Sequence, residues 1–263
     1  MIHSLCQPER TFFLGYSVRQ VGRIFSETPV DDSAEAFVRW IVYSPEMSIH
    51  QRTNREVEVK LLVPDAAAML RKLATLGARC ERRVLERNTL YDTPDSDFRR
   101  RNTLLRIRVE TPAPRTSAQL PKTTHGASPI RRTILTSKAP AVLHTSRDRH
   151  YKEKLERELV VPGSRTRWDR KLCSLGLRPG FRYDKIRSTF RLRRHPGLAI
   201  ELDETPAGTF LELEGFPPDI DRAARALGYS SRDYYRGTYW DVYVANCRRR
   251  GLTPRNMLFH KQK

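Results

Sequence analysis

One unit occurs three times in this sequence: a strand-like run with a Glu-x-Glu pattern, a break marked by proline, a short helical stretch and a Leu-Gly pair. The Glu-x-Glu patterns begin at Glu56, Glu156 and Glu212. Because proline and glycine interrupt regular structure, each copy is predicted to form a strand followed by one short amphipathic helix. The expected helices cover Ala66–Leu76, a stretch through Trp168, Leu172 and Leu175, and Ile220–Leu227.

The ends of these helices are predicted from capping residues. Asp65, and either Asp219 or Asp221, can accept hydrogen bonds from the free N–H groups of a first helical turn. A glycine that follows a helix can adopt the left-handed conformation that ends it. The glycines in this position are Gly77, Gly176 and Gly228.

Between the three units lie further runs in which apolar and polar residues alternate, as in strands. They are Arg83–Tyr91, Thr103–Glu110, Thr133–Lys138, Arg182–Arg193 and Leu198–Asp203. Together with the three Glu-x-Glu strands they make about eight, joined mostly by turns, so a mainly antiparallel sheet is predicted. The predicted fold class is α+β: an antiparallel barrel with the helices packed on its outside.

The barrel is expected to occupy residues 49–260 as a single domain. Residues 1–48 fit no regular element and are expected to be an N-terminal extension, either a basic arm or sequence upstream of a true start near Met47. Two segments rich in Pro, Ser, Thr and basic residues, 111–132 and 139–150, are expected to be flexible insertions.

The charge is strongly positive: 49 Lys and Arg against 30 Asp and Glu give a formal net charge of +19. An excess of this kind arises from an Arg-rich proteome or indicates an anionic partner such as nucleic acid, acidic lipid or a polyphosphorylated small molecule. No apolar run approaches the roughly 20 residues of a membrane-spanning helix. The cysteines (Cys6, Cys80, Cys173 and Cys247) are scattered and no secretion pattern begins the chain, so a cytoplasmic protein is predicted.

The charged faces of the strands carry like charges at alternate positions. Glu56 and Glu58 share one face, opposite Val57 and Val59, and the pairs Arg106/Arg108 and Glu212/Glu214 repeat this arrangement. A polar face that simply meets water is the ordinary explanation for one strand. Doubled like charges repel each other, however, and need a divalent cation for the carboxylates and phosphate oxygens for the cations. A barrel with its charged faces inward would bring both sets into one lumen.

These residues resemble the CYTH superfamily, the triphosphate tunnel metalloenzymes, which include class IV adenylyl cyclases and thiamine triphosphatases. Glu56-x-Glu58-x-Lys60 is similar to the ExExK signature of that group, and the resemblance covers about residues 53–260. The other matching motifs follow in order: Leu90–Pro94, Leu105–Arg108, Thr136-x-Lys138, Lys185-x-Arg187, Leu202–Pro206 and Leu211–Gly215.

The resemblance implies an eight-stranded tunnel that acts on a triphosphate with Mg²⁺ or Mn²⁺. The implied metal ligands are Glu56, Glu58, Glu214, Glu212, and Glu201 or Asp203. The implied triphosphate ligands are Lys60, Arg106, Arg108, Lys138, Lys185 and Arg187, with Lys154 a weaker assignment because the register near Glu156 is ambiguous. Glu156 and Glu158 could also form a solvated outer edge. The candidate catalytic residues are Lys138, Glu58 and Lys60, with Lys138 as a general base if burial lowers its pKa.

Two reactions fit one such lumen: hydrolysis of an inorganic or organic triphosphate, which we favour, and cyclisation of ATP to cyclic AMP and pyrophosphate. The candidate substrates are tripolyphosphate, thiamine triphosphate and ATP. A non-catalytic nucleic-acid- or polyphosphate-binding protein is the remaining alternative; the runs Arg99–Arg101 and Arg248–Arg250 favour it, but no nucleic-acid-binding motif supports it. Uncovered strand surface would allow a homodimer. The aromatic C-terminal extension, Tyr234–Lys263, is expected to pack against the barrel wall, with base stacking as the alternative.

Overall fold

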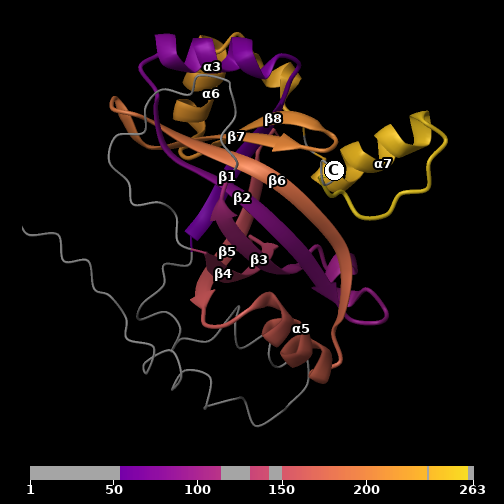
Figure 1. Cartoon of the computed structure of the whole chain (residues 1–263). Coiled ribbons are helices and arrows are strands. Elements are labelled where there is room, and N and C mark those ends of the chain that lie inside the picture. Colours follow the sequence, from indigo (N-terminus) through magenta and orange to yellow (C-terminus); the bar gives the residue numbers. More distant parts are fainter. Residues whose placement is uncertain (1–53, 114–130, 142–149, 236, 260–263) are drawn as a thin grey trace, which may run out of the picture.

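The computed structural model describes residues 54–113, 131–141, 150–235 and 237–259. The predicted N-terminal extension, residues 1–48, and most of both predicted insertions lie outside these residues. Within them the chain forms a closed barrel of eight antiparallel strands, with helices packed around it (Figure 1). The α+β barrel predicted from the alternating pattern is therefore confirmed.

The strands follow one another around the barrel in the order β1-β5-β4-β3-β2-β6-β7-β8. This order places β1 between β5 and β8, so the three Glu-x-Glu strands, which are far apart in the sequence, lie side by side. The bounds are β1 Asn54–Val63, β2 Arg79–Asp92, β3 Leu104–Pro112, β4 Arg132–Pro140, β5 Lys152–Val161, β6 Arg178–Leu192, β7 His195–Thr205 and β8 Gly208–Glu214.

The helices cover the outward apolar faces of the strands. α3 and α6 pack on β1, β7 and β8 through a cluster that includes the fully buried Leu73 and Ile220. α5 packs on the other side of the barrel, where Trp168 and Leu172 contact Leu105 and Leu135 in a second cluster (Figure 1). The helices are α3 Ala66–Thr75, α4 Asp97–Arg100, α5 Arg165–Ser174, α6 Pro217–Ala226 and α7 Tyr239–Arg249.

Most of the predicted helix ends are confirmed. The side chain of Asp65 accepts a hydrogen bond from the Ala68 N–H at 3.0 Å. Gly77, Gly176 and Gly228 all have positive φ, of 74°, 82° and 89°.

The prediction that Asp219 or Asp221 caps α6 is wrong. The helix begins earlier, at Pro217, and its N-cap is Phe216, which makes no side-chain cap. Proline suits the first helical positions because its φ is already helical and its missing N–H would have no partner there. Asp219 lies within the first turn and instead contacts Arg222 and His195.

The strands differ from the prediction mainly at their edges. β3 runs to Pro112 and β4 begins at Arg132, so both extend into the predicted insertion 111–132. β8 ends at Glu214, whereas the pattern predicted a strand through Phe216. Gly215 has a φ of 156° and is followed closely by Pro217 and Pro218, which form no strand.

The C-terminal segment is attached to the barrel by backbone hydrogen bonds. Tyr235 N–H donates to the Lys60 carbonyl at 2.7 Å, and Met257 N–H donates to the Arg182 carbonyl at 2.9 Å. These bonds fix α7 between two points on β1 and β6. No helix among the described residues is long and apolar enough to cross a membrane.

Candidate active site

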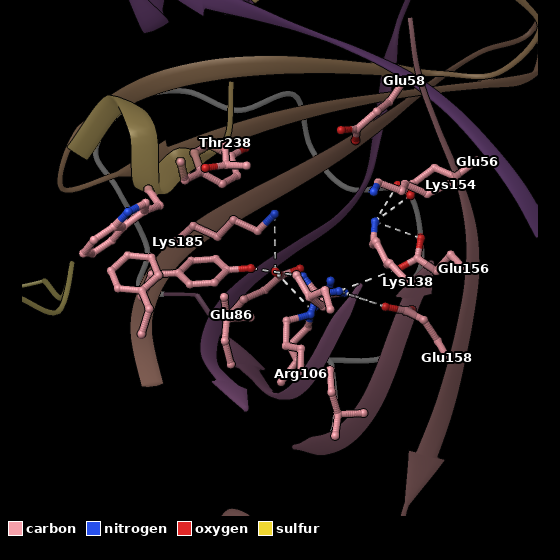
Figure 2. A pocket seen from close by; sticks show the side chains of 18 of the residues that line it. Glu56, Glu58, Glu86, Arg106, Lys138, Lys154, Glu156, Glu158, Lys185 and Thr238 are labelled. Carbon is pink, nitrogen blue, oxygen red and sulfur yellow. Dashed lines mark hydrogen bonds and ion pairs between the residues drawn. The ribbon is translucent and has the colours of Figure 1, made fainter. Parts of the chain in front are cut away.

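The inner face of the barrel encloses a cavity of about 1500 Å³, to which all eight strands and the start of α7 contribute side chains. On β1, Glu56, Glu58 and Lys60 line this cavity, whereas Val59 and Leu61 lie in the outer apolar cluster. The predicted inversion, with charges inside and apolar residues outside, is thus present. Figure 2 shows carboxylates and cations from several strands pointing into the same space.

The inner side chains of β1, β5, β4 and β3 are linked by ion pairs. The Lys138 ammonium lies 2.6 Å from a carboxylate oxygen of Glu56 and 3.1 Å from Glu156. The Arg106 guanidinium lies 3.7 Å from Glu156 and 3.3 Å from Glu158 (Figure 2). Acid and base therefore alternate along this part of the wall.

The alternation continues across β3, β2 and β6. Arg108 lies 3.4 Å from Glu86, and Lys185 lies 3.5 Å from the same carboxylate. Lys185 also lies 2.9 Å from Asp203, which accepts a further hydrogen bond from Arg187 at 2.7 Å. Glu86 and Asp203 thus hold three cations of β3 and β6 in place.

Tyr239 also belongs to this arrangement, although it lies on α7 and not on a strand of the barrel. Its hydroxyl lies 2.5 Å from Asp203 and 2.9 Å from Glu212, and the Lys60 ammonium lies 4.3 Å from the centre of its ring. Glu212 in turn pairs with Lys60 and Arg187. The chain of ion pairs therefore runs almost entirely around the inner wall.

The balance of charge differs between two parts of this wall. We call Glu56, Glu58, Glu156 and Glu214, on the adjacent strands β1, β5 and β8, the acidic sector. Glu58 and Glu214 are paired residues in the register of β1 and β8. Three cations contact this sector among the described residues: Lys138 bonds to Glu56, Arg106 lies 3.7 Å from Glu156, and Lys152 lies 3.8 Å from Glu58.

Burial and mutual repulsion disfavour the ionised carboxylates of the acidic sector. Burial, together with repulsion from Glu156 and Glu58, raises the pKa of Glu56 to about 8 against the attraction of Lys138. Burial also raises the pKa of Glu214. Additional positive charge would relieve this sector.

We call Arg106, Arg108, Lys185 and Arg187 the cationic sector. All four line the cavity. Burial alone would lower the pKa of Arg108, but Glu86 and Glu158 raise it above its ordinary value. Arg108 is therefore a charged donor suited to phosphate oxygens, and the other three side chains carry the same kind of N–H donors.

A hard divalent cation fits the acidic sector by the chemistry of its donors. Mg²⁺ and Mn²⁺ prefer carboxylate oxygens, and Glu56, Glu58 and Glu214 supply such oxygens at the cavity. Within the described residues no three Asp, Glu, His or Cys side chains already lie close enough to hold a metal ion. Binding there would require side-chain movement, with Glu56 turning away from Lys138.

Glu201, Asp203 and Glu212, also predicted as metal ligands, lie among cations. Asp203 is fully buried against Lys185 and Arg187, and both Glu201 and Glu212 pair with Arg187. In this structure the three carboxylates position the cationic sector. Their assignment as metal ligands stays a prediction.

The predicted lysines occupy distinct positions. Lys154 faces Glu56 across the β1–β5 pair and donates to the Asn102 carbonyl at 2.9 Å, which settles its register. Glu156 and Glu158 line the cavity, so the alternative of a solvated outer edge does not hold. Burial would lower the pKa of Lys138, but Glu56 and Glu156 outweigh it and raise that pKa. A protonated Lys138 suits phosphate binding, and its role as general base stays a prediction.

Three residues of the site were not predicted from the sequence: Glu86, Tyr183 and Tyr239. Glu86 is a single carboxylate on its strand, so a search for doubled charges misses it. Despite complete burial, Arg108, Lys185 and Arg187 hold its pKa well below the ordinary value. Tyr239 belongs to the extension expected to pack on the barrel wall, whereas its ring enters the tunnel, where burial raises the pKa of its hydroxyl well above the ordinary value.

The profile of the CYTH domain family matches residues 54–239 of the chain. No curated protein sequence matches this chain. The matched range begins with β1 and ends at Tyr239, so it spans all eight strands of the barrel.

Solved structures share the fold. A candidate adenylate cyclase from Vibrio parahaemolyticus is 17% identical, with a TM-score of 0.55 over 73% of this chain and 98% of that chain. A protein from Pyrococcus horikoshii is 22% identical, with a TM-score of 0.55 over 73% of this chain and 99% of that chain. A candidate adenylyl cyclase from Hippeastrum with a dominant triphosphatase activity is 17% identical, covers 76% of this chain and 97% of that chain, and has a TM-score of 0.46. At such identities the likeness shows the fold and not the reaction.

Proposed function

This chain belongs to the CYTH family, and we propose that it is a divalent-metal-dependent triphosphatase whose substrate binds inside the tunnel. The observation that carries the proposal is the juxtaposition of the acidic and cationic sectors within one cavity. A metal ion bound to a triphosphate presents positive charge at one side and phosphate oxygens at the other. The carboxylates of the acidic sector would face the metal, and the cations of the cationic sector would face the phosphate oxygens.

Glu56, Glu58 and Glu214 are the residues we assign to the metal. When bound, a Mg²⁺ or Mn²⁺ ion would neutralise charge on the phosphate oxygens and lower the pKa of a coordinated water. Glu201, Asp203 and Glu212 remain secondary candidates, because each is already engaged by a cation of the wall.

Arg106, Arg108, Lys185 and Arg187 are assigned to the triphosphate, joined by Lys60 and Lys138. Their positions are fixed by carboxylates behind and beside them, notably Glu86 and Asp203. Preorganised donors of this kind stabilise charge that develops on non-bridging oxygens without having to reorganise during the reaction. Lys154, at the edge of the same cavity, would contact the outer end of the substrate.

In the reaction that we propose, a water molecule attacks the terminal phosphorus. The bond between that phosphorus and its bridging oxygen breaks, and the products are orthophosphate and a diphosphate. Lys138 would hold the terminal phosphate once Glu56 no longer occupies its ammonium. Glu58 and Lys60, on the same face of β1, would orient the nucleophile and the phosphate respectively.

The proposal is tested by incubating purified protein with Mg²⁺ or Mn²⁺ and tripolyphosphate, thiamine triphosphate or ATP. Orthophosphate, pyrophosphate and cyclic AMP are measured separately. We expect orthophosphate release that EDTA abolishes and that Arg108→Ala reduces by at least about 100-fold, since a buried phosphate ligand contributes mainly to the transition state. Lys171→Ala, an exposed change on α5, is the matched control. Absence of turnover with every substrate and both metals would refute the enzyme.

ATP cyclisation is the second candidate because an aromatic surface adjoins the cationic sector, formed by Phe181, Tyr183 and Trp240. In that reaction the ribose 3′-hydroxyl attacks the α-phosphorus and pyrophosphate leaves. If the assay yields cyclic AMP and pyrophosphate with little orthophosphate, the activity is cyclisation and not hydrolysis.

A further inference from the structure

We propose that Trp240 and Phe181 form a subsite that binds the uncharged base of a nucleoside triphosphate. The inference rests on the proposed function, because it concerns the organic end of a substrate whose phosphates bind in the cationic sector. It assigns a specific role to the C-terminal segment.

The subsite lies where α7 and β6 meet at the cavity. Phe181 and Trp240 both line the cavity, and their ring centroids are 4.6 Å apart with planes inclined by 68°. Phe181 also stacks on Tyr183, with centroids 5.5 Å apart and an angle of 18°. We call Phe181, Tyr183 and Trp240 the aromatic wall. Thr238, two residues before Trp240, lies on the same side of the cavity as Lys185 (Figure 2).

The aromatic wall is continuous with the proposed phosphate site. The Tyr183 hydroxyl accepts a hydrogen bond from Arg106 at 3.1 Å, and the ring of the same tyrosine stacks on Phe181. The wall therefore starts at a phosphate-binding cation and leads away from it to Trp240. A triphosphate held by Arg106 would carry its organic group along this surface.

Phe181 and Trp240 differ from the neighbouring tyrosines in their exposure. Tyr183 and Tyr239 are buried, whereas Phe181 and Trp240 remain half-exposed at the cavity. The segment is also anchored without them, since Met257 N–H donates to the Arg182 carbonyl and the Asn256 side chain accepts from the Arg182 N–H at 3.0 Å. Half-exposed rings on an anchored frame can stack with a planar base.

Two charged residues of the cavity bear on the choice between an uncharged ring and the cationic thiazolium of thiamine. Arg255 and Asp92 both line the cavity. Asp92 already accepts hydrogen bonds from the backbone N–H groups of Thr93, Phe98 and Arg99. Because this carboxylate is engaged and Arg255 is a cation, we assign the subsite to an uncharged ring.

The test compares ATP, thiamine triphosphate and tripolyphosphate as substrates of wild type, Trp240→Ala and Trp240→Phe with Mn²⁺. Because base–aromatic stacking changes binding substantially, Trp240→Ala should lower kcat/KM for ATP by about 10-fold or more, chiefly through KM. It should leave tripolyphosphate within about 2-fold of wild type, because that substrate has no base. Trp240→Phe keeps an aromatic face and should retain most of the ATP activity.

Val242→Ala is the matched control, since Val242 lies on α7 and packs in the cluster of Tyr183, Phe210, Tyr239 and Met257 without lining the cavity. We expect Val242→Ala to change the activities toward ATP and tripolyphosphate equally. If the ATP-selective loss came only from the docking of α7, Val242→Ala would also lower the activity toward ATP selectively. Binding is read independently: ATP should quench tryptophan fluorescence in wild type but not in Trp240→Phe. Tripolyphosphate should quench neither.

The outcomes separate the subsite from the proposed function. Equal losses toward ATP and tripolyphosphate in Trp240→Ala, or a stronger loss toward thiamine triphosphate than toward ATP, would overturn the subsite as assigned while leaving hydrolysis intact. If no triphosphate is bound or turned over, both proposals fall. If Trp240→Ala does not fold, Trp240→Leu and Phe181→Leu must show the same ATP-selective loss.

Discussion

At the scale of single residues, the protonation state of Glu56 affects both metal binding and stability. As a predicted metal ligand it must be ionised, yet its surroundings raise its pKa to about 8 from an ordinary 4.5. The folded state thus holds the proton more tightly than the unfolded state does. By linkage, the contribution of Glu56 to stability falls as the pH rises from about 4.5 to about 8.

Glu56→Gln should accordingly remove part of the pH dependence of stability in the absence of metal. In EDTA, the free energy of unfolding of wild type should decrease relative to that of Glu56→Gln as the pH is raised from 5 to 8.5, a range chosen to bracket the pKa of about 8. Urea unfolding at several pH values measures this difference. Glu81→Gln, an exposed change on β2, should follow wild type. A difference that is constant with pH would show that Glu56 is ionised throughout.

Tyr239 supplies a second prediction at this scale. Tyr239→Phe removes a hydroxyl that lies 2.5 Å from Asp203 and 2.9 Å from Glu212. A hydrogen bond to a charged group contributes about 1.5–3 kcal/mol, so the variant should unfold several degrees lower. Its KM for tripolyphosphate should also rise, because Asp203 holds Lys185 and Arg187. Tyr243→Phe, whose hydroxyl meets a backbone carbonyl near the surface, should change calorimetric stability much less.

At the scale of elements, the helices stabilise the barrel from outside and the strands carry the side chains of the site. α5 covers β3, β4 and β5 from outside, whereas the charges of those strands face the cavity. Leu172→Ala in α5 empties a fully buried position and should cost about 2–5 kcal/mol in the free energy of unfolding. At a temperature where the variant remains folded, its KM for metal and substrate should match wild type. A selective loss of metal affinity would show that α5 also shapes the site.

The elements were predictable where two local signals agreed. Alternation identified the strands, and proline, Asp65 and the glycines after each helix marked helix ends. The start of α6 was missed because Pro217 and Pro218 predict a break before the helix, whereas they form its first turn. Strand edges were missed because the hydrogen bonds that extend β2 and β6 depend on partners distant in the sequence.

The candidate site could be predicted where like charges alternate along a single strand. Doubled charges identified the residues of β1, β3, β6 and β8 that line the cavity. Glu86 and Tyr239 were missed because their roles depend on which strands become neighbours and on where α7 docks. The division of carboxylates between an acidic sector and supports for cations likewise depends on the strand order, which places β5, β1 and β8 together.

At the scale of the whole molecule, the barrel brings the acidic sector and the cationic sector to the same cavity. The formal net charge of +19 belongs to the whole chain, whereas the cavity is lined by cations and carboxylates together. This arrangement predicts mutual assistance: metal in the acidic sector should draw Glu56 from Lys138 and leave that lysine for phosphate. Metal and triphosphate should each raise the affinity for the other, and by thermodynamic linkage they must do so by the same factor.

The most direct measurement is a calorimetric titration of Mn²⁺ and tripolyphosphate, each with and without the other, in wild type, Glu58→Gln and Arg106→Ala at one pH. In wild type each ligand should bind at least about 10-fold more tightly in the presence of the other, a coupling of about 1.4 kcal/mol. Glu58→Gln should mainly weaken Mn²⁺, and Arg106→Ala should mainly weaken tripolyphosphate. If both variants bound both ligands as wild type does, or if the ligands bound independently, the tunnel would not be the shared site.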